Sequence, residues 1–198
     1  MKKVLVIGDT HGNIKKMLKI IKQEHADYVI HAGDYDDVNI NDKNHPYHKL
    51  NRNILKKYFS YWTKGNHDFT VKYGPAKTQK DFENFIFKAY RIFKIDGITF
   101  FLSHFVDNSR NEIGFGDQQW YIKNKKFVNW LKKIIKCEHI DFIITGHTHV
   151  AKYWNMFNLP ALNPGSLVAP KHDQFTGSYA TFLIKNHKIH DLKINFVD

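Results

Sequence analysis

Five short apolar segments of this chain are each followed, within a few residues, by carboxylate, imidazole or carboxamide side chains. An apolar run of this length, ending at a glycine or a polar residue, is typical of a buried strand. In α/β sheets the loops just past the carboxyl ends of strands lie close together, and ligands bind there. The polar side chains are therefore expected to meet at one edge of the sheet. The junctions are Val4–Ile7 before Gly8-Asp9-Thr10-His11, Tyr28–Ile30 before Gly33-Asp34, Phe59–Thr63 before Gly65-Asn66-His67-Asp68, Ile98–Leu102 before Ser103-His104, and Phe142–Thr145 before Gly146-His147-Thr148-His149.

The segments between these strands alternate between helical spacing and hairpin signals. Asn13 is expected to cap a helix that runs through Glu24, and residues 50–58 and 120–136 also have helical patterns. Hairpins are expected at Asp96-Gly97 and at Asn186-His187, each between two apolar runs. This mixture predicts an α/β fold, with a mixed sheet or two packed sheets, in a single domain over residues 1–198.

The composition is that of a globular protein. The chain has 198 residues, of which 42% are hydrophobic, and at this size it can bury roughly 70% of its unfolded surface. The single cysteine, Cys137, excludes a disulfide framework and a cysteine-based zinc ribbon, and it is expected to be a buried thiol. No targeting segment or membrane span is recognisable, so a cytoplasmic protein with no membrane partner is expected.

The net charge of +11 suits a polyanionic partner, such as a nucleic acid or a phosphorylated substrate. Lysines spread evenly over the surface would give the same number. Since no base-stacking or groove-reading element is recognisable, a nucleic-acid partner has no motif to support it. The sequence leaves the oligomeric state open.

The polar side chains at the strand ends offer oxygen and imidazole-nitrogen ligands without a thiolate. Burying two carboxylates beside several imidazoles would be costly unless cations satisfied them. Mixed nitrogen and oxygen ligation suits Mn, Fe, Zn or Ni better than Mg or Ca. Taken singly, an Asp-x-His or Gly-Asp pair is more often chance or a turn, but the ordered set favours a pair of divalent cations. The candidate ligands are Asp9, His11, Asp34, Asn66, His104, His147 and His149.

These motifs together resemble the calcineurin-like metallophosphoesterase superfamily. The short length, and the Asn163-Pro164-Gly165-Ser166 turn expected to wall the site, are similar to its small bacterial and archaeal phosphodiesterase branch. The resemblance implies a four-layer αββα sandwich, in which two packed mixed sheets are flanked by helices, with a binuclear metal centre at one edge. The matching motifs are Asp9-Thr10-His11-Gly12, Gly33-Asp34, Gly65-Asn66-His67-Asp68, His104 and Gly146-His147-Thr148-His149.

The resemblance also implies a role for each matching residue. It implies two divalent ions, Mn²⁺ first, with Fe, Zn or Ni as alternatives. His67 would be a catalytic, non-ligand histidine over the substrate phosphate, and Asp37 would orient its ring. The ligand sets would be Asp9, His11 and His149 for one metal, Asn66, His104 and His147 for the other, and Asp34 as the bridge.

The implied reaction is hydrolysis of a small phosphodiester by in-line attack of a metal-bridging hydroxide, with His67 assisting the leaving group. The chain departs from the family pattern at Phe105, where Gly is common, at Val38, where Arg is common, and at His67, where many small phosphodiesterases have Cys. A phosphomonoesterase or protein phosphatase and a dinucleoside polyphosphate hydrolase therefore stay open as alternatives. A nuclease or a non-catalytic interaction module is a more distant one.

Overall fold

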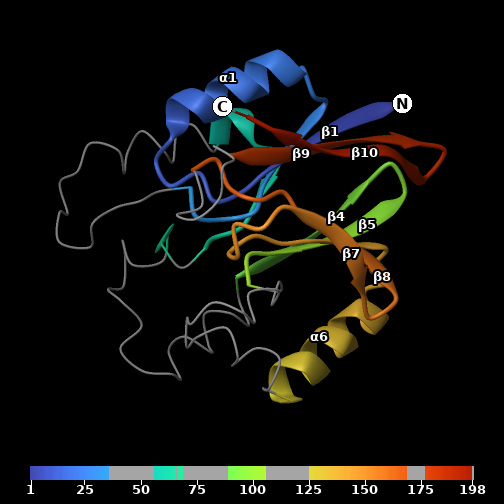
Figure 1. Cartoon of the computed structure of the whole chain (residues 1–198). Helices are drawn as coiled ribbons and strands as arrows, with labels where there is room; N and C mark the ends of the chain where they lie inside the picture. Colours follow the sequence, from blue (N-terminus) through green and yellow to red (C-terminus); the bar gives the residue numbers. More distant parts are fainter. Residues whose placement is uncertain (36–55, 66, 69–88, 106–124, 169–176, 198) are drawn as a thin grey trace.

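The computed structural model describes residues 1–35, 56–65, 67–68, 89–105, 125–168 and 177–197. In this part of the chain ten strands form two five-stranded sheets that pack face to face (Figure 1). Both sheets contain parallel and antiparallel neighbours. The expected α/β fold with two packed mixed sheets is confirmed, whereas the extent of the domain, 1–198, stays a prediction.

The first sheet is built around the amino-terminal strand and has the order β10-β9-β1-β2-β3. β1 pairs in parallel with β2 and antiparallel with β9, so it lies at the centre of the sheet. The strands are β1 (Lys2–Ile7), β2 (Tyr28–His31), β3 (Tyr61–Trp62), β9 (Ser178–Lys185) and β10 (Lys188–Phe196).

The second sheet has the order β4-β5-β6-β8-β7. β5, β6 and β8 run parallel to one another. The edge strands β4 and β7 pair antiparallel with β5 and β8, respectively, and each forms a hairpin with its partner. The strands are β4 (Tyr90–Ile95), β5 (Ile98–Ser103), β6 (Phe142–Ile144), β7 (Lys152–Met156) and β8 (Leu159–Asn163).

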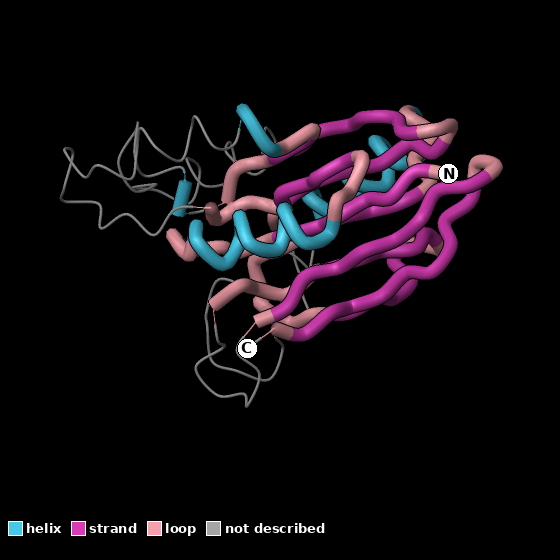
Figure 2. The backbone as a smooth tube through the Cα atoms, turned by 90° about the horizontal axis from the view of Figure 1, so that it is seen from above, coloured by secondary structure: helices cyan, strands magenta, loops and turns pink. Residues whose placement is uncertain are grey.

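The central strands bury side chains on both faces, which explains why they read as continuous apolar runs rather than alternating ones. In β1, Val4 and Val6 face the core between the sheets, whereas Leu5 and Ile7 face α1 (Ile14–Glu24). Figure 2 shows α1 lying over the strands of the first sheet. On the second sheet, Phe101 and its neighbours pack against α6 (Lys125–Cys137), so the layers follow the order helix, sheet, sheet, helix.

The structure corrects two local expectations and adds a hairpin that the sequence did not predict. Asn13 occupies the N-cap position of α1 but makes no side-chain capping hydrogen bond. Cys137 is exposed rather than buried, because it is the last residue of α6. The β7–β8 hairpin was not predicted: its turn residues Phe157 and Asn158 have φ angles of 53° and 66°, and Phe is not a residue that signals such a turn.

The hairpins predicted at Asp96-Gly97 and Asn186-His187 are confirmed, and their turns contact each other across the two sheets. The Asp96 carbonyl oxygen lies 2.8 Å from His187 Nδ1. Gly97 has a φ of +87°, and a Cβ atom there would meet the His187 ring. The two turns therefore join the sheets at the end where the amino terminus lies (Figure 1).

None of the described helices is long and apolar enough to span a membrane.

Replacement Gly97→Ala is expected to lower the free energy of unfolding by about 1–2 kcal/mol, because L-residues are strained at positive φ and the His187 ring must move aside. Urea unfolding measures the change. In a His187→Ala background the same replacement should cost less, since only the backbone strain remains. An equal cost in both backgrounds would contradict the contact between the turns.

Candidate metal centre

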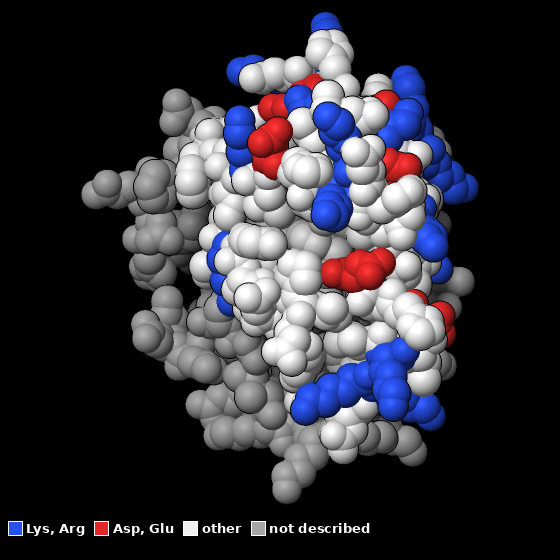
Figure 3. All heavy atoms as spheres, turned by 90° about the vertical axis from the view of Figure 1, so that its right-hand side faces the viewer, with Lys and Arg blue, Asp and Glu red and all other residues white. Residues whose placement is uncertain are grey.

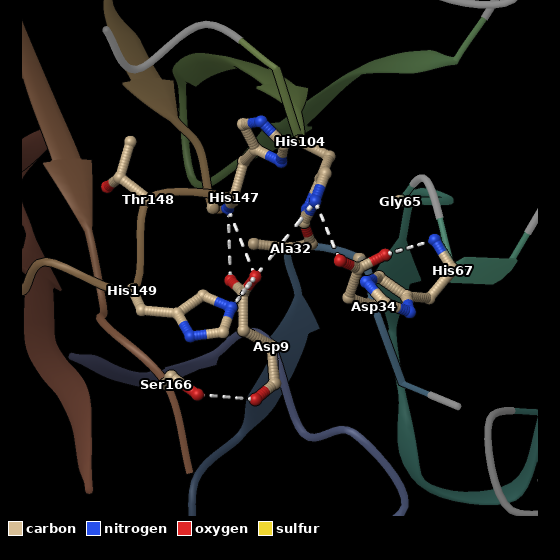
Figure 4. A network of polar contacts seen from close by, with 12 residues as sticks. Asp9, Ala32, Asp34, Gly65, His67, His104, His147, Thr148, His149 and Ser166 are labelled. Carbon is tan, nitrogen blue, oxygen red and sulfur yellow. Dashed lines mark hydrogen bonds and ion pairs between the residues drawn. The ribbon is translucent and has the colours of Figure 1, made fainter. Parts of the chain in front are cut away.

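The loops after β1, β2, β5 and β6 converge at one edge of the two sheets (Figure 4). The loops of the first sheet continue the parallel pairing beyond the strands. Asp9 N–H donates to the Gly33 carbonyl at 2.9 Å, and His11 N–H donates to the Asp34 carbonyl at 3.0 Å. These bonds fix the two carboxylate-bearing loops side by side, facing the histidines that follow β5 and β6.

One cluster contains Asp9, His11 and His149, whose ligand atoms all lie within 4.8 Å of one another. His149 Nε2 is 3.1 Å from Asp9 Oδ1 and 3.0 Å from His11 Nε2. His149 follows a strand of the second sheet, whereas Asp9 follows one of the first. The cluster therefore joins the two sheets.

A second cluster contains Asp9, Asp34 and His104. His104 Nε2 lies 3.2 Å from Asp34 Oδ2 and 4.0 Å from Asp9 Oδ1. The other ring nitrogen, Nδ1, lies 2.8 Å from the Ala32 carbonyl oxygen and donates to it, which turns Nε2 toward the carboxylates. A third group, His11, Asp34 and His67, shares members with both.

The charges of these groups depend strongly on one another. Asp9, Asp34 and His104 are buried. Burial alone would raise the pKa of Asp34, but the neighbouring His104 charge brings it below its ordinary value. Burial opposes protonation of His104, yet Asp34 and Asp9 raise its pKa to about 9. Positive charge is therefore strongly favoured between the two carboxylates.

The backbone is strained at the residues that carry these side chains. Five of the six predicted ligands that the structure describes have φ in the left-handed region, which non-glycine residues seldom adopt. Such conformations cost of order 1–3 kcal/mol each and cluster at functional sites. They are Asp9 (47°), His11 (44°), Asp34 (53°), His147 (73°) and His149 (61°).

Two glycines allow the loops to approach the carboxylates closely. A Cβ atom on Gly146 would lie 2.7 Å from Asp9 Oδ2 and 2.9 Å from the Ala32 carbonyl oxygen. A Cβ atom on Gly65 would meet the Asp34 carboxylate. Side chains at these two positions would push the carboxylates out of place.

His147 and His149 do not lie on an extended segment, because both have positive φ. The His147 backbone N–H donates to the Asp9 carboxylate at 3.1 Å. Its side chain is partly buried, and the centroid of its ring lies 5.2 Å from that of the His104 ring. Burial, followed by the His104 charge, lowers the pKa of His147 to about 4, which leaves a neutral imidazole beside the clusters.

Of the other predicted site residues, His67 lies at the edge of the clusters. Its backbone N–H donates to Asp34 Oδ1 at 2.9 Å, and its ring meets His11 edge-on at a centroid distance of 4.8 Å. Asn66 and Asp37 lie outside the described residues.

Asp68 is a site residue to which the sequence assigned no role. Its carboxylate is buried and accepts backbone N–H groups from Asp34 at 2.7 Å, Tyr35 at 3.0 Å and Gly65 at 2.8 Å. It thereby ties the loop after β2 to the loop after β3. Its place next to His67 in the motif was the only signal in the sequence.

His31 is a second residue of this kind. Its ring is fully buried, and Nδ1 accepts the Gly33 N–H at 3.1 Å. Nε2 lies 2.7 Å from Thr10 Oγ1, so the neutral ring donates there. The imidazole thus braces the loop that carries Asp9 against the loop that carries Asp34. Burial lowers the pKa of His31 to about 3.

A model of the calcineurin-like phosphoesterase superfamily domain matches residues 1–187. This chain belongs to the calcineurin-like phosphoesterase superfamily. Members of the superfamily typically bind divalent metal ions, and the two carboxylates and neighbouring imidazoles of this phosphoesterase fit such ions by their donor chemistry.

Two curated relatives align along most of the phosphoesterase chain. A probable metallophosphoesterase of Mycoplasma pneumoniae is 28% identical over 196 residues, covering 99% of this chain and 98% of the relative. A phosphodiesterase of Methanocaldococcus jannaschii is 27% identical over 167 residues, covering 82% of each chain.

Solved structures share the fold of this phosphoesterase. A novel archaeal phosphodiesterase superposes with a TM-score of 0.58 at 18% identity, covering 98% of this chain and 99% of that one. Vps29 of Entamoeba histolytica, complexed with Zn²⁺, superposes with a TM-score of 0.53 at 20% identity, covering 99% and 98%. At this level of identity the likeness concerns the fold alone.

The stability of the phosphoesterase should fall as pH falls from about 6.5 toward 3, and His31 should contribute to this fall. In this pH range His31 stays neutral in the folded state but binds a proton in the unfolded chain. Its contribution to the free energy of unfolding therefore changes by about 1.4 kcal/mol per pH unit. Unfolding free energies measured in EDTA should therefore depend less on pH in His31→Gln.

His190→Gln, which replaces an exposed histidine of β10, is the control for this series and should keep the wild-type slope. Equal slopes for His31→Gln and the wild type would show that His31 is protonated in the folded state.

Proposed function

We propose that this protein is a metal-dependent phosphodiesterase. The observation that carries the proposal is the meeting of Asp9, His11, Asp34, His104 and His149 in overlapping clusters beside His67. The sequence similarity to a phosphodiesterase of Methanocaldococcus jannaschii supports the preference for diesters over other phosphoesters.

The proposed centre holds two cations. Asp9, His11 and His149 would bind one, and Asp34 would be shared with the second. His104 and His147 would bind the second together with Asn66. Mn²⁺ fits this donor set, and Fe, Zn or Ni are the alternatives, because imidazole nitrogens are present in both proposed ligand sets.

Cations bound in such a pair increase the acidity of a coordinated water and neutralise charge on the phosphoryl oxygens. Asp34 orients its neighbours, since one carboxylate oxygen accepts the His67 N–H and the other faces His104. His67 would place its ring over the substrate phosphate and donate a proton to the leaving oxygen, a contribution of about 10²–10⁴-fold. Asp37 would orient that ring.

The proposed substrate is a small phosphoester. The net charge of +11 favours an anionic substrate in general. Figure 3 shows that, on one face, the basic side chains of the described residues occur in several groups with acidic side chains between them.

The substrate class is tested with purified protein stripped with EDTA and supplied with Mn²⁺. We expect faster turnover of bis-p-nitrophenyl phosphate than of p-nitrophenyl phosphate, and no turnover without added metal. Faster turnover of the monoester would favour a phosphomonoesterase. Tight Mn²⁺ binding without turnover of either ester would favour a non-catalytic interaction module.

His67→Ala is expected to lower kcat by about 10²–10⁴-fold while Mn²⁺ binding is retained, because the ring acts on the leaving group and not on the metal. Calorimetric Mn²⁺ titration and steady-state kinetics measure the two effects separately. Asp34→Asn is the contrasting variant, since loss of the shared charge should weaken Mn²⁺ binding itself. Unchanged turnover in metal-loaded His67→Ala would refute the assigned role.

A further inference from the structure

The carboxamide of Asn163 lies at the end of β8, immediately beside the segment that carries His147 and His149. β8 runs parallel to β6, and Thr145 N–H donates to the Leu162 carbonyl at 2.9 Å, so the two strand ends are in register. Asn163 is fully buried at this junction. It is placed to act on the histidine segment.

Both kinds of polar atom of Asn163 are engaged. Nδ2 donates to the Gly146 carbonyl oxygen at 2.9 Å and to Thr148 Oγ1 at 3.0 Å. Oδ1 accepts the Gly165 N–H at 2.9 Å. Only a carboxamide offers two donors and an acceptor of this size, because a carboxylate would oppose the Gly146 carbonyl and an apolar side chain would leave buried groups without partners.

The two groups that accept from Nδ2 belong to the residues on either side of His147. His147 has a φ of 73°, a conformation that persists only where its surroundings determine it. Thr148 Oγ1 also accepts the Val150 N–H at 3.3 Å, which extends the restraint past His149. Asn163 therefore fixes the backbone from which both histidine rings project.

The turn that begins at Asn163 also contacts the loop that carries Asp9. Ser166 Oγ donates to the Asp9 carbonyl oxygen at 2.8 Å, as Figure 4 shows, and the Leu167 N–H is 3.3 Å from the same oxygen. Asp9 is another strained residue, with a φ of 47°. The turn from Asn163 to Ser166 thus links the histidine segment of the second sheet to the aspartate loop of the first.

We infer that Asn163 is a positioning residue for the metal centre, which orients His147 and His149 through the backbone on either side of them. This inference rests on the proposed function, because it assigns to Asn163 an effect on metal affinity. A purely structural residue at the same place would affect folding but not the affinity or the geometry of a bound ion.

The test compares Mn²⁺ affinity, by calorimetry, and the visible spectrum of bound Co²⁺ in EDTA-stripped protein. Asn163→Ala should raise the Kd for Mn²⁺ by about 10–100-fold, the usual effect of losing a residue that orients metal ligands. The Co²⁺ spectrum should change as well, because the histidine rings are no longer held in one orientation. The matched control is Asn155→Ala, which replaces an exposed asparagine of β7 and should match the wild type in both measurements.

Thr148→Val provides a second variant in case Asn163→Ala does not fold. It keeps the shape of the buried side chain but removes one acceptor of Nδ2, so it should raise the Kd in the same direction by a smaller factor. If the folded variants have the Kd and the Co²⁺ spectrum of the wild type, the positioning role of Asn163 is overturned, but the proposed function is not. A wild-type protein that binds no Mn²⁺ would overturn both.

Discussion

Two carboxylates, Asp9 and Asp34, are removed from water at the point where both sheets end, and the rest of the site follows from this constraint. A buried carboxylate needs a positive partner and hydrogen bonds, or it becomes a large destabilising charge. The imidazole of His104 lies against both carboxylates, with its pKa raised to about 9. An environment that favours a proton so strongly also favours a divalent cation, which carries more charge and takes the same ligand atoms.

Hydrogen bonds around the two loops hold this arrangement in addition to the contacts among the site side chains. The pairing of β1 and β2 continues past the strands into the loops of Asp9 and Asp34. Asp68 adds three backbone bonds behind Asp34, and His31 spans the gap between the two loops. Such redundancy is what allows residues with positive φ to persist, since no single bond has to hold them.

The apolar runs predicted the α/β class, the strand ends and most of the side chains that meet there. The choice of two packed sheets flanked by helices came only from the resemblance to a known family. The sequence did not predict the Phe157-Asn158 turn, where an aromatic residue takes a positive φ. Nor did it show what Asp68 and His31 do. Asp68 accepts the N–H groups of Asp34 and Tyr35, and His31 contacts the Thr10 hydroxyl, all of which lie far away in the sequence. No residue pattern records such partners.

The candidate centre draws residues from both sheets, whereas the apolar core that separates those sheets is filled by rings such as Phe100 and Phe182. The size of these core side chains influences the distance between the ligands carried by the first sheet and those carried by the second, since tightly packed interiors transmit small displacements. An exchange of one large ring for a smaller residue deep inside the sandwich would therefore alter the span between opposite ligands. If ions of different radius bind here, apolar side chains remote from the ligands would then influence which of them fits.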